Sequence, residues 1–260
     1  MADARTIKIP DANGNLVSYT IKDAINKRAR RDITSELASD PTKLIAAIAE
    51  QNLEKYGYTI GDYFLGTTGG STYEYTIADP DTFYGGYTNN AVVNTHHYGV
   101  VVNTFLTSAW GSTSTGYKSS TLQSLLAGQV LTKIKNDITA IFGNWSSHLI
   151  SHKKLFTNNE STGCEWVEAM ISALSEVQTY GSTIWSMNGA QEGECCRQLE
   201  VFRKFRFNEI LRSADHNSGI YPWLRNISSA GTACGAATNG YANSAGVSNP
   251  RSVVGLILLY

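Results

Sequence analysis

Two pairs of histidines are the residues whose spacing comes nearest to a metal site. His148 and His152 lie four residues apart, a spacing that on a helix places two imidazoles on one face, where they could share a zinc ion. The apolar residues around them favour a strand instead, and no third ligand is near. His96 and His97 are adjacent, so on a strand they point to opposite faces and cannot hold one ion together. We therefore predict no metal site, with one histidine of the second pair packed inside and the other at the surface.

Side chains for nucleophilic or acid–base catalysis are present, but no motif groups them. A cysteine nucleophile needs a base within hydrogen-bond reach, and only a distant pairing of Cys164 or Cys195 with one of the five histidines would supply it. Glu192 and Glu194 flank a glycine and could act as acid and base. In a glycine-rich loop, however, solvated carboxylates are the more ordinary interpretation. We predict that the chain has no catalytic residues.

Motifs for calcium and phosphate are incomplete. Asp79-Pro80-Asp81 offers too few oxygen ligands for calcium. Gly69-Gly70 and Gly85-Gly86 are not followed by Lys-Ser/Thr, so they predict turns and not a phosphate loop. The sequence therefore predicts no cofactor.

The four cysteines, at positions 164, 195, 196 and 234, have no metal-ligand spacing. Adjacent Cys195 and Cys196 would form only a strained disulfide with each other. We expect all four to be reduced and mostly buried small hydrophobes. A bridge from Cys234 to one of the other three stays open as an alternative.

The composition favours strands, turns and irregular loops over long helices. Charged residues make up 17% of the chain, below the roughly 25% of a typical soluble domain. Gly, Ser, Thr, Asn and 14 Tyr take their place. The formal net charge of -1, with no basic run, argues against a nucleic-acid partner. Because no stretch approaches the ~18 apolar residues of a membrane span, and the start lacks the apolar core of a secretory signal, we expect a soluble chain made in a cytoplasm with no membrane partner.

The first 57 residues differ in pattern from the rest of the chain. Residues 7–17 alternate apolar and polar side chains around an Asn-Gly turn signal, which predicts a β-hairpin. Apolar residues at helical spacing from Ile21 to Leu37 predict an amphipathic helix. Asp40-Pro41 starts a second helix that ends at Gly57. Two interpretations stay open: a helical pair packed on its own domain, or an anchoring and oligomerising segment.

From Tyr58 onward, strand-like runs alternate with turns and a few helices. We predict helices at 120–127, 130–142 and 165–177, the last from the capping-box spacing of Thr162 and Glu165. Strands are predicted at 73–77, at the apolar runs 91–93 and 100–102, and at 149–156. The nearly continuous apolar run from Arg251 to Tyr260 predicts a strand that lies inside a sheet.

Four runs in this part of the chain resemble one known family. They are 79–87 (DPDTFYGGY) with 94–97 (NTHH), 116–122 (GYKSSTL), the predicted helix 165–177 with 177–182 (VQTYGS), and 223–230 (WLRNISSA) with 239–242 (NGYA). Together they are similar to phage and prophage structural proteins of gut Firmicutes that carry a C-terminal C-type-lectin-like module. Residues 19–24 (YTIKDA) also resemble the start of many phage fibre proteins.

The resemblance implies an α+β chain in two parts. Residues 1–57 would form a hairpin-plus-helices segment for anchoring or oligomerisation, and residues 58–260 a C-type-lectin-like module with a small twisted sheet, flanking helices and long loops. The chain would be a virion protein, assembled in the host cytoplasm and exposed on the particle surface. Its partners would be other proteins of the tail, baseplate or capsid, and it would form a homo-oligomer, with a trimer favoured.

The sequence departs from this family in one place. Such modules often end in Gly-Val-Arg-Pro, whereas this chain has Pro250-Arg251-Ser252-Val253, so Arg251 keeps the arginine but the proline that fixes the turn is missing. The Glu-Pro-Asn and Gln-Pro-Asp runs of calcium-dependent sugar-binding lectins are also absent. Calcium-mediated glycan binding is therefore not supported.

Residues 215–249 are rich in aromatic and asparagine side chains, which supply rigid, amphipathic contact surface. The resemblance implies that this region forms the exposed ligand face, with Trp223 in the core beneath it. We predict the ligand-binding residues to be Tyr221, Asn239, Tyr241 and Asn243. The predicted function is that of a non-enzymatic virion surface protein that attaches to a host surface receptor or glycan. Two alternatives stay open: a head fibre or capsid decoration protein with a purely structural role, and an enzyme of cysteine or glycoside-hydrolase type.

Overall fold

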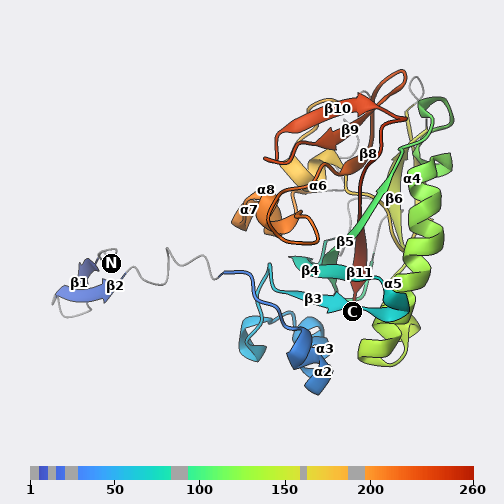
Figure 1. Cartoon of the computed structure of the whole chain (residues 1–260). Helices are drawn as coiled ribbons and strands as arrows, with labels where there is room; N and C mark the ends of the chain where they lie inside the picture. Colours follow the sequence, from blue (N-terminus) through green and yellow to red (C-terminus); the bar gives the residue numbers. More distant parts are fainter. Residues whose placement is uncertain (1–5, 11–15, 21–28, 83–92, 159–162, 187–196) are drawn as a thin grey trace. The chain divides into compact units, whose positions relative to one another are not determined.

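The computed structural model describes residues 6–10, 16–20, 29–82, 93–158, 163–186 and 197–260 (Figure 1). The chain divides into two units, Met1–Arg31 and Asp32–Tyr260. In the first unit, β1 (Thr6–Pro10) pairs antiparallel with β2 (Leu16–Thr20), which confirms the predicted hairpin. Its Asn13-Gly14 turn and the predicted helical residues 21–28 lie outside the described residues. The second unit is a mixed α+β structure.

The centre of the larger unit is a four-stranded antiparallel sheet. Its strand order is β11 (Arg251–Leu259), β5 (Tyr98–Ser108), β4 (Tyr73–Pro80), β3 (Tyr63–Gly66). The predicted alternation in β4 puts Tyr73, Tyr75 and Ile77 in the core, and the intervening Glu74 and Thr76 are buried as well. Both faces of the sheet are therefore covered. In Figure 1, α4 (Thr121–Leu125) and α5 (Leu131–Phe142) run along one side of the sheet.

The strand β11 lies at the edge of this sheet, and the prediction of an interior strand was wrong in that respect. Its apolar sequence is explained by other segments that close its outer edge. Backbone bridges join it to Leu149, Ser172 and Pro222. These segments satisfy its backbone groups, as in the hydrogen bond from Leu256 N to Ser172 O (2.9 Å), so β11 is buried like an interior strand.

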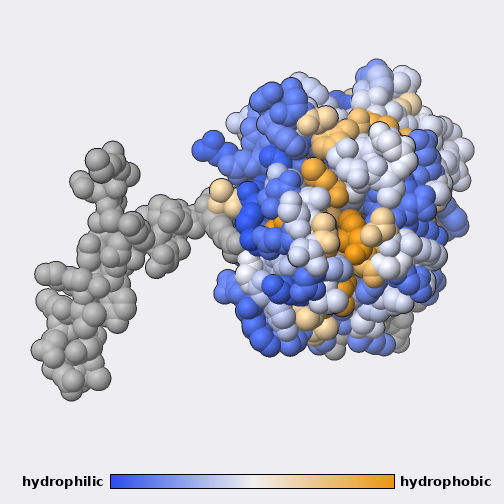
Figure 2. Space-filling model, turned by 60° about the horizontal axis from the view of Figure 1, so that its bottom comes forward, coloured by the Kyte–Doolittle hydropathy of each residue, from blue (hydrophilic) through white to orange (hydrophobic). Residues whose placement is uncertain are grey.

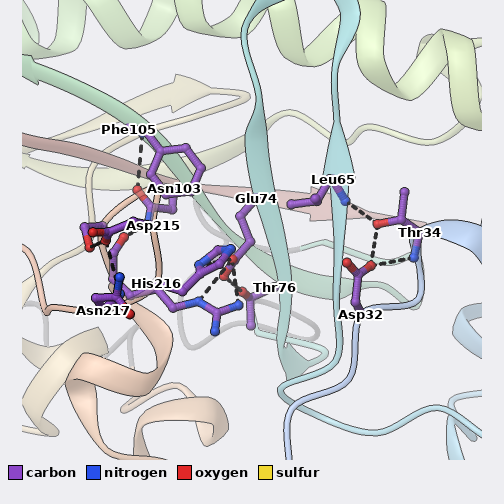
Figure 3. Close-up of polar contacts among 12 residues, drawn as sticks. Asp32, Thr34, Leu65, Glu74, Thr76, Asn103, Phe105, Asp215, His216 and Asn217 are labelled. Carbon is purple, nitrogen blue, oxygen red and sulfur yellow. Dashed lines mark hydrogen bonds and ion pairs between the residues drawn. The ribbon is translucent and has the colours of Figure 1, made fainter.

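The opposite edge, β3, is closed by the start of the unit. Ile33 N donates to Tyr63 O (2.9 Å), and Leu65 N donates to Thr34 Oγ1 (2.9 Å). Asp32 in turn accepts hydrogen bonds from the backbone and side chain of Thr34. Figure 3 shows this group of residues beside the strand. Other segments of the chain therefore cover both edges of the sheet, where an open strand could pair with another molecule.

The predicted helix at 165–177 was wrong. Strand β6 (His152–Thr157) pairs antiparallel with β7 (Cys164–Ala169), and Trp166 is opposite Leu155. The capping box that we assigned to 162–165 instead occurs at Ser175 and Gln178, where it starts α6 (Glu176–Tyr180). Cross-strand pairing with β6 outweighs the helical spacing, and the aromatic Trp166 and the β-branched Val167 favour a strand. The third resembling run therefore follows a strand and not a helix.

The predicted helices at 120–127 and 130–142 are confirmed. Ser120 accepts a hydrogen bond from Gln123 N (3.0 Å) and caps α4, a π-helical turn η5 (Leu126–Val130) follows, and α5 ends at Gly143, which has φ +95°. The remaining elements of the unit are η1 (Glu54–Tyr56), η2 (Thr68–Gly70), η3 (Thr113–Thr115), η4 (Tyr117–Ser119), η6 (Trp145–Ser147), α7 (Glu200–Lys204), α8 (Phe207–Ile210), β8 (Trp223–Ser229), β9 (Thr232–Ala236) and β10 (Ala242–Gly246).

The helices α2 (Thr34–Ser39) and α3 (Thr42–Ala49) belong to the larger unit, although we expected them in a separate segment of residues 1–57. Their buried side chains join the same hydrophobic core as the central sheet; they are Leu37, Leu44, Ala47 and Ile48. The structural division therefore lies at Arg31–Asp32 and not at residues 57–58.

Candidate ligand-binding face

The four predicted ligand residues lie on or near the surface of the three-stranded sheet β10-β9-β8 and its loops. Tyr241 is 73% exposed and Tyr221 is 50% exposed, and both are large side chains that rarely remain so open. Asn239 is also exposed, whereas Asn243 is half-buried on β10. Trp223 is fully buried, as predicted. The aromatic exposure was therefore predicted correctly, while ligand binding by these residues stays a prediction.

One row across this sheet brings three residues together. Gly235 on β9 is opposite Trp223 on β8 and opposite Asn243 on β10. Directly opposed residues share a face of the sheet. A side chain at Gly235 would meet the guanidinium of Arg251, since its Cβ would lie 2.7 Å from Nη1. Because Gly235 has no side chain, the guanidinium of Arg251 can lie against its backbone.

Arg251 lies against the two aromatic rings of this face. Its Cζ is 4.9 Å from the centroid of the Trp223 ring and 5.9 Å from that of Tyr221, within the range of cation–π attraction. Its Nη1 atom is buried and has no hydrogen-bond partner among the described residues. Burial lowers the pKa of Arg251, and the nearby Tyr221 opposes that shift.

The local charge at this face is positive. From His216 to Tyr260 the sequence contains two arginines, Arg225 and Arg251, and no aspartate or glutamate. Arg225 is buried and fully engaged, because it donates to Leu155 O (3.2 Å), Ala173 O (3.1 Å) and Gln178 Oε1 (2.7 Å). Arg251 is half-buried, and no described carboxylate pairs with it.

From the sequence we expected Arg251 only to begin a strand inside a sheet. Its position in this face was missed. The signal that could have found it is the long acid-free stretch around an arginine among aromatic residues.

A polar cluster anchors residues 212–219, the segment that precedes this face in the chain (Figure 3). Glu74 on β4 is fully buried and accepts hydrogen bonds from Arg212 Nη2 (3.0 Å) and Nε (3.3 Å). His216 Nδ1 lies 3.8 Å from the same carboxylate. Asn103 on β5 donates to Arg212 O (2.7 Å). These contacts anchor the segment that leads directly into Tyr221.

Two residues of this cluster have a left-handed backbone conformation, which residues other than glycine rarely adopt. Phe105 has φ +57° and His216 has φ +61°, and each costs of order 1–3 kcal/mol. The amide of Phe105 donates to Asn103 Oδ1 (3.3 Å), and the amide of His216 donates to Ser213 O (2.8 Å). Asp215 accepts hydrogen bonds from the Ser213 side chain and from Asn217 N, which hold the turn. The bond from Ser213 also lowers the pKa of Asp215. These hydrogen bonds therefore hold the backbone of residues 212–219 and of neighbouring Phe105 in place.

The described histidine and cysteine candidates lie on several different segments of the chain. His148 lies in a turn and His152 is buried in β6, so they do not share a helix face. His96 is exposed beside Asp81 (2.8 Å), and His97 is buried, which confirms the predicted division. Cys164 and Cys234 are not bridged to each other.

Four candidates, Glu192, Glu194, Cys195 and Cys196, lie outside the described residues. Across the part of the chain that the structure describes, no group of three or more His, Cys, Asp or Glu is placed to hold a metal ion.

A pocket of about 280 Å³ lies between α2, β3 and α5. Figure 2 brings this end of the molecule forward and shows apolar residues at its surface among hydrophilic ones. The polar groups in the pocket are already engaged: Asp137 accepts from Tyr75 Oη (2.6 Å) and from Lys133 Nζ (2.9 Å). The pocket thus presents no unsatisfied group to a ligand comparable to Arg251.

Comparison with models of protein families, with curated proteins and with solved structures finds no match to this chain. None of the described helices is long and apolar enough to cross a membrane.

Proposed function

We propose that the chain is a non-enzymatic phage virion surface protein that attaches the particle to a host surface receptor or glycan. In this proposal the larger unit is a C-type-lectin-like module, residues 1–31 lead to the particle, and other virion proteins and further copies of the chain are its partners. The resemblance of the four sequence runs supports the family. The exposed aromatic face supports the binding role.

The observation that carries the proposal is the pair of open tyrosines on a fixed backbone. Tyr241 O accepts from Ala237 N (2.8 Å) and its amide donates to Asn239 Oδ1 (3.2 Å). Tyr221 O accepts from Ser252 N (2.8 Å) on β11. Because the backbone is already ordered, a ligand that stacks on these rings loses little additional conformational entropy. Rigid aromatic side chains of this kind are typical of binding surfaces.

The test is a binding assay with the full chain on host cells and on a glycan array. We expect saturable binding that weakens about tenfold or more in Tyr241→Ala, because an exposed tyrosine that anchors a ligand contributes about 1.4 kcal/mol or more. The substitution should leave the thermal unfolding midpoint unchanged, since the side chain is 73% exposed. Trp185→Ala, which removes another exposed aromatic residue (52%), is the matched control. Saturable binding that Tyr241→Ala leaves intact would contradict the role of this face.

A purely structural role on the head is the second candidate, and a different surface favours it. Ile184 and Trp185 are 51% and 52% exposed. The buried carboxylate of Glu176 holds them outward, accepting from Ile184 N (3.1 Å), Trp185 N (3.0 Å) and Ser186 N (2.9 Å). An exposed apolar pair that is fixed in this way is suited to packing against a neighbouring protein.

The two candidates are separated by the same two variants in assembled particles. If the role is structural, Trp185→Ala lowers the number of copies per particle while Tyr241→Ala leaves attachment to host cells unchanged. If the role is adhesive, Tyr241→Ala lowers attachment at an unchanged copy number.

A further inference from the structure

We propose that Tyr221, Asn243 and Arg251, with the buried Trp223 and Gly235 beside them, form a face that binds an acidic saccharide, with Arg251 holding its oxyanion. This inference rests on the proposed binding function and names the chemical class of the ligand. The oxyanion is the carboxylate of an acidic sugar or the phosphate of a phosphorylated sugar, because a guanidinium pairs with either in the same planar geometry.

The first support is the unsatisfied hydrogen-bonding capacity of Arg251. A guanidinium has five N–H donors, and leaving a buried donor without an acceptor costs of order 1–3 kcal/mol. Nη1 of Arg251 is such a donor among the described residues, and because it is buried against Gly235, a ligand would be held by the other N–H groups of this half-buried side chain. Arg225, on β8, shows the contrast, since backbone carbonyls and Gln178 accept from it. A purely structural arginine would be expected to find comparable acceptors.

The second support is the electrostatic setting. The stretch from His216 to Tyr260 contains no acidic side chain, so an anion approaching Arg251 meets no nearby repulsion from this segment. Trp223 and Tyr221 lie within cation–π range of the guanidinium and favour its position there. A cation that is already oriented and only partly hydrated loses less on binding an anion than a mobile surface lysine does.

The third support is the composition of the rim. Tyr221 and Tyr241 offer open ring faces, on which the apolar face of a sugar ring can pack. Asn239 and Asn243 carry amide groups that can both donate to and accept from hydroxyls. An inorganic anion would use only Arg251, whereas a saccharide that carries an anion uses the whole face.

The experiment measures binding of the full chain to matched pairs of saccharides by titration calorimetry. Each pair has one sugar skeleton in a neutral, a carboxylated and a phosphorylated form, so that the two sources of the oxyanion are distinguished. We expect at least one anionic form to bind tenfold or more tightly than the neutral form. We also expect its affinity to fall as salt is raised from 50 to 500 mM, because added ions screen the charge pair.

Three variants complete the test. Arg251→Met keeps the packing on Trp223 and removes the charge, and it should abolish the preference for the anionic form. Arg251→Lys keeps the charge without the planar fork, folds even if the methionine variant does not, and should reduce the preference at least threefold. Lys43→Met removes an exposed cation on α3 as the matched control and should change nothing.

The outcomes separate this inference from the proposed function. Saccharide binding that is sensitive to Tyr241→Ala but equal for neutral and anionic forms would overturn the acidic ligand and leave the attachment role standing. An anionic preference that both Arg251 variants retain would assign the anion to another site. Failure of the chain to bind cells or any saccharide would remove both proposals together.

Discussion

Gly235 is the single position at which a small change should disturb the candidate face most. Its Cβ in Gly235→Ala would lie 2.7 Å from Arg251 Nη1 and 2.9 Å from Pro222 O, so the guanidinium must move. We expect a loss of about 1–3 kcal/mol in the free energy of unfolding together with weaker ligand binding. Chemical denaturation and titration measure the two effects. Gly246→Ala on β10 is the matched control, because its Cβ would have only Asn249 Nδ2 near, at 3.7 Å. Equal effects of the two substitutions would show that Gly235 makes no special space.

The buried histidines should make stability depend on pH. Burial lowers the pKa of His152 well below its usual value, and Lys154, His97 and Arg225 add to that shift. Burial also lowers the pKa of His97. A histidine with a depressed folded pKa takes up its proton on unfolding, so stability is full above pH ~6.5 and falls as the pH drops below it. Between pH 7.5 and 5.5 we expect a loss of about 1.4 kcal/mol from His152 alone.

Denaturant unfolding at the two pH values measures this dependence. His152→Gln should reduce the pH-dependent loss, whatever its own effect on stability at pH 7.5. His148→Gln, at a half-buried position in a turn, should leave the loss unchanged. An identical pH dependence in all three proteins would show that other groups control it.

At the residue scale, the sequence predicted which aromatic side chains are exposed better than it predicted which residues contribute to the candidate face. Tyr221 and Tyr241 were predicted correctly to be exposed, and Trp223 to be buried, because turn-rich loops and apolar runs carry that information. The place of Arg251 in this face was predictable only in part, from the acid-free stretch around it. It depends on a glycine from β9 and two aromatic residues that the register of three strands brings together, and sequence alone does not determine that register.

At the scale of elements, a buried carboxylate ties helix α5 to the sheet in addition to the apolar packing of Ile134 and Ile138. Asp137 accepts from Tyr75 Oη on β4, from Thr68 N (3.0 Å) and from Lys133 Nζ within the helix. Removing a buried charge partner costs about 3–5 kcal/mol, because Lys133, only 12% exposed, would stay without its counter-charge. We expect that loss for Asp137→Ala and less than about 0.5 kcal/mol for the exposed neighbour in Asn136→Ala.

Thermal and denaturant unfolding of the two variants test this attachment. The double variant Lys133→Met/Asp137→Leu should recover much of the stability, because it removes both charges and keeps apolar volume in their place. If Asp137→Ala unfolds like the unsubstituted chain, the carboxylate does not hold the helix on the sheet.

The elements also show where pattern-based prediction works. Helix α5 has a clear 3.6-residue apolar period and a terminating glycine, so local signals were sufficient. Strand β7 was mistaken for a helix because apolar residues at 167, 170, 171 and 174 happen to have helical spacing. What overrides that spacing is the pairing of β7 with β6, a tertiary contact that the local pattern does not contain.

At the scale of the whole molecule, the boundary between the two units decides which fragment folds. Ile33, Leu37, Leu44 and Ile48 are each at most 2% exposed and lie in the core of the larger unit. Burying each contributes about 1.5–3 kcal/mol, so together they approach the ~5–15 kcal/mol stability of a typical domain.

We therefore expect a fragment of residues 32–260 to unfold cooperatively with a midpoint within a few degrees of the full chain. A fragment of residues 58–260 should show no cooperative transition by circular dichroism. Two fragments with equal midpoints would contradict the boundary at Arg31–Asp32 and support the division first expected from the sequence.

The placement of β5 between β4 and β11 has a consequence for how the chain is made. β4 and β5 are near neighbours in sequence, but the contact from Thr104 Oγ1 to Val253 O joins residues 149 positions apart. During synthesis, the apolar edge of β5 around Val100–Val102 stays open until β11 has left the ribosome. Such long-range pairing is slow, and an open apolar strand invites pairing with other nascent chains. Slower synthesis at lower temperature should therefore increase the soluble yield of this protein more than that of a protein whose sheet is completed by local hairpins.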